Sequence, residues 1–136
     1  MTGTIFVIPC SGIGKPFGTI SREATYTVVE DLKKDMTDTV CLSLLVMGDK
    51  KTRNLVKNHQ CIAVDGCPAE CSRKNIELSG GQLAASFRVV DLLRENRGLK
   101  TQKVTFLDEN GKKLAQIMAQ KIASKVDELN QGGSAQ

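Results

Sequence analysis

Hydrophobic positions along the chain follow two patterns: short apolar runs, and longer stretches in which apolar residues recur every three or four positions. The runs 4-TIFVIP-9, 60-QCIAVDG-66 and 86-SFRVVDLL-93 are short and contain many β-branched residues, which is typical of strands. A glycine-rich loop, SGIGKPFG, follows the first run and separates it from the next pattern. These runs predict three strands, and a further apolar run covers residues 39–47.

Helices are predicted between and after these strands. The segment DKKTRNLVKN, residues 49–58, indicates a short basic helix with Leu55 and Val56 facing inward. Residues 68–79 predict another short helix, closed by Gly80-Gly81, because glycine readily adopts the left-handed conformation that ends a helix. Two longer helices each carry an apolar stripe with a period near 3.6 residues. The stripes consist of Ile20, Ala24, Val28, Val29, Leu32 and Met36 in the first helix, and Leu114, Ile117, Met118, Ile122, Val126 and Leu129 in the last.

Two segments admit a second interpretation. Alternation alone lets the run at residues 39–47 continue as a strand to Met47, whereas a short strand followed by a helix near residue 42 is the other possibility. The Asn110-Gly111 pair is a strong hairpin signal at the start of the last helix. We prefer the helix there, because its apolar stripe runs unbroken for about four turns.

Alternating strands and helices predict an α/β fold with a mainly parallel sheet, because parallel strands need crossover connections. We expect a single-domain, Rossmann-like three-layer sandwich with about four strands. The domain should span residues 1–130, and the polar tail QGGSAQ, residues 131–136, should be disordered.

Length and composition indicate the number of domains, the cellular compartment and the kinds of partner to expect. The chain of 136 residues fits one domain. It contains no apolar run near the length of about 20 residues that a membrane span requires, and its N-terminus does not read as a secretion signal. We therefore expect a cytoplasmic protein with no membrane association. The net charge of +4 comes with only one Tyr, four Phe and no Trp, so a nucleic-acid partner is not favoured.

Five cysteines carry the candidate chemistry, and an odd number argues against a closed set of disulfides. Cys10 follows the first predicted strand, and Cys67 with Cys71 follows the third. The carboxyl ends of parallel strands share one edge of the sheet, so we expect these thiols to converge. Cys41 joins them only if its strand is short or a helix begins near residue 42, and Cys61 is expected to be a core residue of its strand.

The segment CPAEC suggests a helix that begins at Cys67 or Pro68, since proline is favoured at the first helical position. Both thiols would then lie on one side of its first turn, close enough for a single zinc ion. The helix N-terminus favours thiolates, which either bind metal or react. Lys15, Arg73 and Lys74 would offset the negative charge of such a site or act as ordinary surface cations.

The neighbouring residues have more modest predicted roles. Asp65 is expected to shape the turn, and Gly66 to let the backbone pass close to the site or take a positive φ. The loop CSGIGK at residues 10–15 lacks the spacing of a phosphate-binding P-loop. His59 is expected to be an exposed residue at a helix end and is a poor candidate for catalysis.

The string IAVDGCPAECSRKNIEL, residues 62–78, resembles the signature of the DGC domain family, small zinc-binding proteins. The resemblance extends to Cys-Ser-Gly at 10–12, Cys-Leu at 41–42 and Gly-Leu-Lys at 98–100. It implies four metal ligands, Cys10, Cys41, Cys67 and Cys71, with a structural, sensing or carrier role for the ion. It implies no particular reaction.

Two other functions stay open at this point. The protein could be a thiol redox or sulfur-transfer protein that uses Cys67 and Cys71, or Cys10, as reactive thiols. It could also be an interaction domain in which the cysteines are incidental. Four thiolates equally suit an iron–sulfur cluster, so the sequence alone does not choose between Zn²⁺ and such a cluster.

Overall fold

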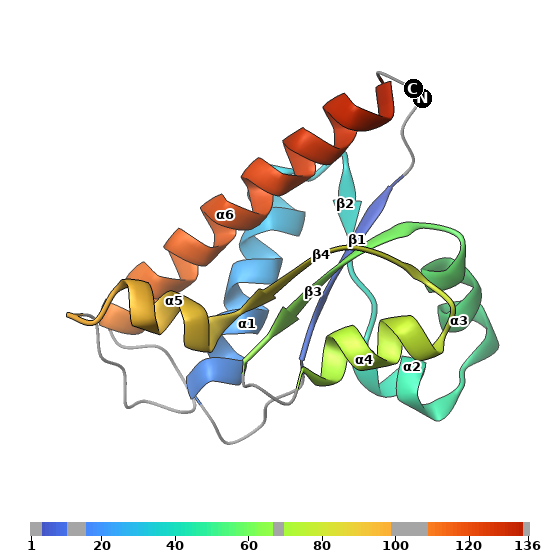
Figure 1. The fold of residues 1–136 in the computed structure, drawn as a ribbon, viewed down its shortest axis with the longest axis horizontal. Coiled ribbons are helices and arrows are strands. Elements are labelled where there is room, and N and C mark those ends of the chain that lie inside the picture. The colour runs from blue at the N-terminus through green and yellow to red at the C-terminus, as the bar shows by residue number, and fades with distance from the viewer. Residues whose placement is uncertain (1–3, 11–15, 67–69, 99–108, 135–136) are drawn as a thin grey trace.

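The computed structural model describes residues 4–10, 16–66, 70–98 and 109–134, and its elements alternate along the chain as the sequence predicts. A four-stranded sheet is flanked by helices (Figure 1). In chain order the elements are β1 (Ile5–Pro9), α1 (Pro16–Thr27), the π-helix η1 (Val28–Leu32), β2 (Thr37–Asp38), α2 (Leu42–Met47), α3 (Lys50–Lys57), β3 (Gln60–Asp65), α4 (Cys71–Leu78), β4 (Gln82–Arg88), α5 (Val89–Glu95) and α6 (Glu109–Ser134).

The strand order is β2-β1-β3-β4, and every neighbouring pair is parallel. Val7 of β1 lies opposite Ile62 of β3, and Val64 of β3 lies opposite Phe87 of β4. All four strands therefore point the same way, so their carboxyl ends share one edge of the sheet. The predicted α/β, Rossmann-like sandwich with a parallel sheet is confirmed.

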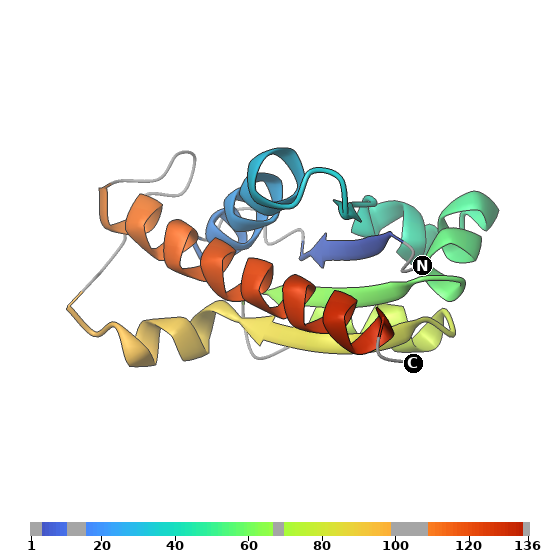
Figure 2. The same ribbon diagram turned by 90° about the horizontal axis from the view of Figure 1, so that it is seen from above.

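Alternate residues of β1 and β3 enter two separate cores, because successive side chains of a strand point to opposite faces. Ile5 and Val7 pack with α1 and α6 on one face. Phe6 and Ile8 pack with α2, α3 and α4 on the other. Figures 1 and 2 show the two groups of helices on opposite sides of the strands, which makes a three-layer arrangement.

The last helix follows the prediction closely. Leu114, Met118, Ile122 and Val126 are buried, and Asn110-Gly111 lies inside α6 rather than in a hairpin. The helix continues to Ser134, into the segment from residue 131 that was expected to be disordered. Adding residues to an existing helix costs little compared with starting one, which is consistent with this extension.

The first helix ends earlier than its apolar stripe predicts. Its last turn widens into η1, and Lys33, at φ −133°, ends it. Met36 lies in the turn that follows, where its carbonyl accepts a hydrogen bond from the N–H of Ile5 at 3.0 Å. Leu32 and Met36 are consequently 37% and 41% exposed, so the prediction that they belong to the buried stripe was wrong.

The structure decides between the two interpretations left open for residues 39–47. None of these residues lies in a strand: β2 covers Thr37–Asp38, directly before the run, and residues 42–47 form α2, so the chain turns into a helix near residue 42. Leu42 and Leu45 are buried, whereas Leu44, Val46 and Met47 are exposed. Residues three positions apart share one face of a helix but not of a strand, so burial on one side only favours the helix.

The fourth strand, expected over 86–93, begins at Gln82 and ends at Arg88. Val89 and Leu92, three residues apart, are both buried in α5, because α5 packs on α6 and α1. In the described ranges, no helix has the length and apolar character needed to cross a bilayer.

Candidate metal centre

Cys10 lies at the carboxyl edge of the sheet, one residue beyond β1. Pro9 pairs with Val64 of β3, and the Cys10 N–H donates to the Val64 carbonyl at 2.9 Å. Cys10 is therefore level with Asp65, the last residue of β3. The predicted convergence of the first and third strand ends is confirmed for these residues.

The Cys10 thiol also contacts the turn that follows β3. The Gly66 N–H donates to Cys10 Sγ at 3.0 Å, and Ser21 Oγ of α1 lies 3.6 Å from the same sulfur. The sulfur is buried and accepts a backbone hydrogen bond from a residue 56 positions away. Gly66 thus brings its backbone close to the thiol, as predicted. The next residue, Cys67, lies outside the described residues.

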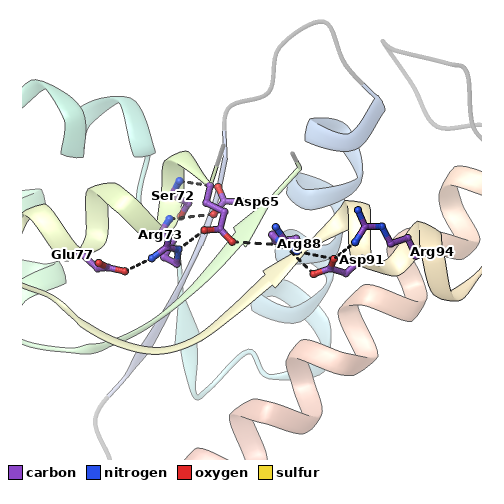
Figure 3. Close-up of polar contacts among 8 residues, drawn as sticks. Asp65, Ser72, Arg73, Glu77, Arg88, Asp91 and Arg94 are labelled. Carbon is purple, nitrogen blue, oxygen red and sulfur yellow. Dashed lines mark hydrogen bonds and ion pairs between the residues drawn. The ribbon is translucent and has the colours of Figure 1, made fainter. Parts of the chain in front are cut away.

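Asp65 holds the start of α4 against the sheet. Its carboxylate is buried and accepts hydrogen bonds from the N–H groups of Ser72 at 2.8 Å and Arg73 at 3.2 Å (Figure 3). The Ser72 hydroxyl donates to the Ile8 carbonyl of β1 at 2.7 Å. Burial raises the pKa of the Asp65 carboxyl, and the two N–H groups oppose that shift. These contacts are those of a residue that shapes the turn.

Cys71 is exposed and is the first residue of α4. The prediction that this helix begins at Cys67 or Pro68 was wrong. Glu70, directly before Cys71, has the left-handed conformation (φ 52°, ψ 50°), which a continuing right-handed helix does not allow. Because Asp65 binds the N–H groups of residues 72 and 73, the helix starts where that carboxylate reaches it.

Cys41 lies directly before α2, as its N-cap residue, and is exposed. Because β2 is short and a helix starts at Leu42, both conditions set by the sequence for Cys41 to reach the edge are met. Leu42 belongs to the same core cluster as Cys10, and α2 packs against α4. The N–H groups of Leu44 and Ser43 lower the pKa of the Cys41 thiol, although neither makes a regular capping hydrogen bond to it.

Cys61 differs from these cysteines. Its side chain is fully buried in β3, and burial raises the pKa of its thiol to about 11. The sulfur lies 3.5 Å from the His59 carbonyl and 3.6 Å from the Val56 carbonyl. The core role predicted for it is confirmed. His59, expected to be exposed, is half-buried, with its ring edge-on to Phe6 at 4.9 Å between centroids.

A row of ion pairs runs beside the cysteine turn, and sequence reasoning missed most of it. Arg73 binds Glu70 at 2.5 Å and Glu77 at 2.8 Å. Arg88, the last residue of β4, lies 3.7 Å from Glu70 and makes two 2.9 Å bonds to Asp91 (Figure 3). Arg73, predicted as one possible counter-charge for a metal site, is thus already paired with two carboxylates. The four-residue spacing from Arg73 to Glu77 was a signal in the sequence; the approach of Arg88 to Glu70 had none.

The described part of the chain contains no cluster of three or more His, Cys, Asp or Glu side chains close enough to hold a metal ion. Of the four predicted ligands, Cys10, Cys41 and Cys71 are described. Cys10 directly follows β1, Cys41 directly precedes α2, and Cys71 is the first residue of α4. Each therefore comes after the carboxyl end of a strand of the parallel sheet.

Comparison with known proteins agrees with the resemblance noted in the sequence. The family model of the DGC domain matches residues 6–119, which include all five cysteines and every element from β1 into α6. Neither the curated proteins nor the solved structures contain a match. The chain therefore belongs to the DGC domain family.

Proposed function

We propose that the protein binds a metal ion, zinc in the first instance, through Cys10, Cys41, Cys67 and Cys71 at the carboxyl edge of the sheet. One observation carries the proposal: the Gly66 N–H donates to Cys10 Sγ at 3.0 Å. That bond joins the end of β1 to the residue directly before Cys67. It requires the two segments to meet, and it aims a donor at the sulfur, as the hydrogen bonds around metal-bound ligands do.

The donor set suits zinc. Tetrahedral sites of four cysteines are common for structural Zn²⁺, and the ligands must be thiolates. Cys41 and Cys71 stand at the N-terminal ends of α2 and α4, where the helix dipole favours negative charge. The lowered pKa of Cys41 agrees with that placement. Four thiolates and one divalent ion leave a net charge of about −2, which the exposed Lys74 beside this turn would reduce.

Exposure favours a metal that is exchanged over one that only supports the fold. Cys41 and Cys71 are both exposed, whereas each face of the sheet has its own buried apolar core. A chain of this size does not need a metal in order to fold. We therefore assign the ion a sensing or carrier role, in a cytoplasmic setting that keeps the thiols reduced.

Metal analysis of protein purified without added zinc tests the proposal. We expect about one equivalent of zinc per chain, because four thiolates complete one tetrahedral site. The Cys10→Ser, Cys41→Ser, Cys67→Ser and Cys71→Ser variants should each lose most of it. Cys61→Ala is the matched control: this cysteine is buried in β3, so its removal should leave the zinc content unchanged. Equal metal content in Cys67→Ser and Cys61→Ala would contradict the proposal.

The same preparations separate the alternatives. A brown colour after anaerobic purification would identify an iron–sulfur cluster. Metal-free wild-type protein in which iodoacetamide rapidly labels Cys67 or Cys71 at neutral pH would instead indicate thiol redox or sulfur-transfer chemistry.

A further inference from the structure

Glu70 stands out next to the cysteine turn because of its backbone. Among the described residues it is the one non-glycine residue with positive φ. Side chains other than glycine disfavour this conformation, and it persists where surrounding contacts enforce it. The residue that follows Glu70 is Cys71, so the left-handed turn sets the direction from which that thiol leaves the backbone.

Contacts on both sides of the turn enforce this conformation. On the side-chain side, one Glu70 carboxylate oxygen binds Arg73 Nε at 2.5 Å, and the other lies 3.7 Å from Arg88 Nε. On the backbone side, the Glu70 carbonyl accepts the Lys74 N–H at 3.0 Å, the first hydrogen bond of α4. The Glu70 side chain is 18% exposed, so its charge is partly shielded from water.

The two arginines are themselves held in place. Arg88 is the last residue of β4, and its guanidinium donates two hydrogen bonds of 2.9 Å to the Asp91 carboxylate of α5. Arg73 belongs to α4, and Asp65 accepts its N–H. Glu70 thus ties the turn to two fixed elements, α4 and the end of β4.

We infer that Glu70 is a positioning residue of the metal site: by pairing with Arg73 and Arg88 it fixes the backbone directly before Cys71, which restrains this ligand once metal is bound and slows metal release. This inference rests on the proposed function. Ser72, on the other side of Cys71, is held equally firmly by Asp65 and by the Ile8 carbonyl. Cys71 therefore sits between two anchored residues before any metal arrives, which is the kind of outer-shell support that orients a ligand.

The test compares two carboxylates that bind the same arginine. Glu70→Gln removes the charge beside Cys71, and Glu77→Gln removes the charge at the exposed end of α4, 2.8 Å from Arg73. We expect zinc transfer to the chelator 4-(2-pyridylazo)resorcinol to accelerate about tenfold in Glu70→Gln, the lower end of the effect of outer-shell substitutions. Glu77→Gln should release zinc at the wild-type rate. Both variants should keep the wild-type stoichiometry.

A third variant separates the carboxylate from the backbone conformation. Glu70→Gly favours the left-handed turn but cannot pair with either arginine, so it should release zinc as fast as Glu70→Gln. Cobalt(II)-loaded protein gives an independent readout, because the visible bands of the ion report its ligand geometry. These bands should change in both Glu70 variants and remain unchanged in Glu77→Gln.

Equal release rates in Glu70→Gln and Glu77→Gln would overturn the inference, as would wild-type slow release in Glu70→Gly. An acceleration explained by an equal loss of global stability in the metal-free protein would also overturn it. These outcomes leave the proposed function intact, provided that the wild-type protein holds its metal. Wild-type protein without bound metal would overturn both together.

Discussion

Removing the Asp65 carboxylate should loosen α4 from the sheet. In Asp65→Ala the N–H groups of Ser72 and Arg73 lose acceptors at 2.8 and 3.2 Å. A buried donor left without a partner costs about 1–3 kcal/mol, and the first of these bonds is buried while the second is partly buried. The substitution also removes a carboxylate whose raised pKa shows that burial disfavours its charge. We expect the free energy of unfolding to fall by about 2–3 kcal/mol.

Urea unfolding at neutral pH, followed by far-UV circular dichroism with and without a chelator, measures this loss. With a typical urea dependence, the midpoint should fall by about 1 M or more. Asp49→Ala is the matched control, because Asp49 also caps a helix, accepting the Thr52 N–H of α3 at 3.0 Å, but is exposed to solvent. Its loss should be smaller. An Asp65→Ala variant that is no less stable than Asp49→Ala would refute the reasoning, because burial would then add nothing to the carboxylate's role.

Two further predictions concern the core behind the site. The pKa of Cys61, raised to about 11 by burial, exceeds the ordinary thiol value of about 8.5. The buried neutral thiol therefore contributes its full stabilisation below about pH 8.5, and this stabilisation is lost as the pH rises toward the folded-state pKa of about 11. Cys61→Ala should accordingly lose less stability than wild type between about pH 9 and pH 10.5 in urea titrations, and parallel curves would contradict this. Gly81→Ala should lower the free energy of unfolding by about 1–3 kcal/mol, because a Cβ there would lie 2.7 Å from Val56 and 3.0 Å from Ile76. Gly98→Ala, with nothing within 4 Å of its Cβ position, is the control, and an equal loss in both variants would count against a packing origin.

The two central strands and the last helix could be predicted from the sequence, because the hydrophobic pattern of each matches the faces that are buried in the folded protein. Residues 5–8 of β1 and 61–64 of β3 are buried on both faces of the sheet, so these runs are continuously apolar. The stripe of α6 matches the face that packs on the sheet. In such elements a local pattern and a tertiary surface favour the same structure.

The segments that the sequence left open or mispredicted have apolar residues whose burial depends on a neighbouring element. Leu42 and Leu45 fit a strand or a helix equally well by sequence, and α4 and the sheet provide a surface for one side only. Val89 and Leu92 continue the apolar run of β4, yet they pack on the α6 side as part of a helix. Periodicity over a few residues does not separate these cases.

Strand direction made part of the candidate site predictable. Parallel strands bring their carboxyl ends together, so the proximity of Cys10 to the turn after β3 followed from the order of elements. The start of α4 was different. Pro68 is a local signal for a helix start, but the buried Asp65 carboxylate binds the N–H groups of residues 72 and 73 and favours a start at Cys71.

By itself the amino-acid sequence determined the class of fold, the family and the position of Cys10 at the carboxyl edge of the sheet, since these depend on residue type, period and order along the chain. Only the tertiary structure decided which carboxylates and arginines surround the cysteine turn. Glu70 and Arg88 are 18 positions apart and come within 3.7 Å only because β4 pairs beside β3. Contacts of that kind depend on the relative placement of whole elements, which no local pattern encodes.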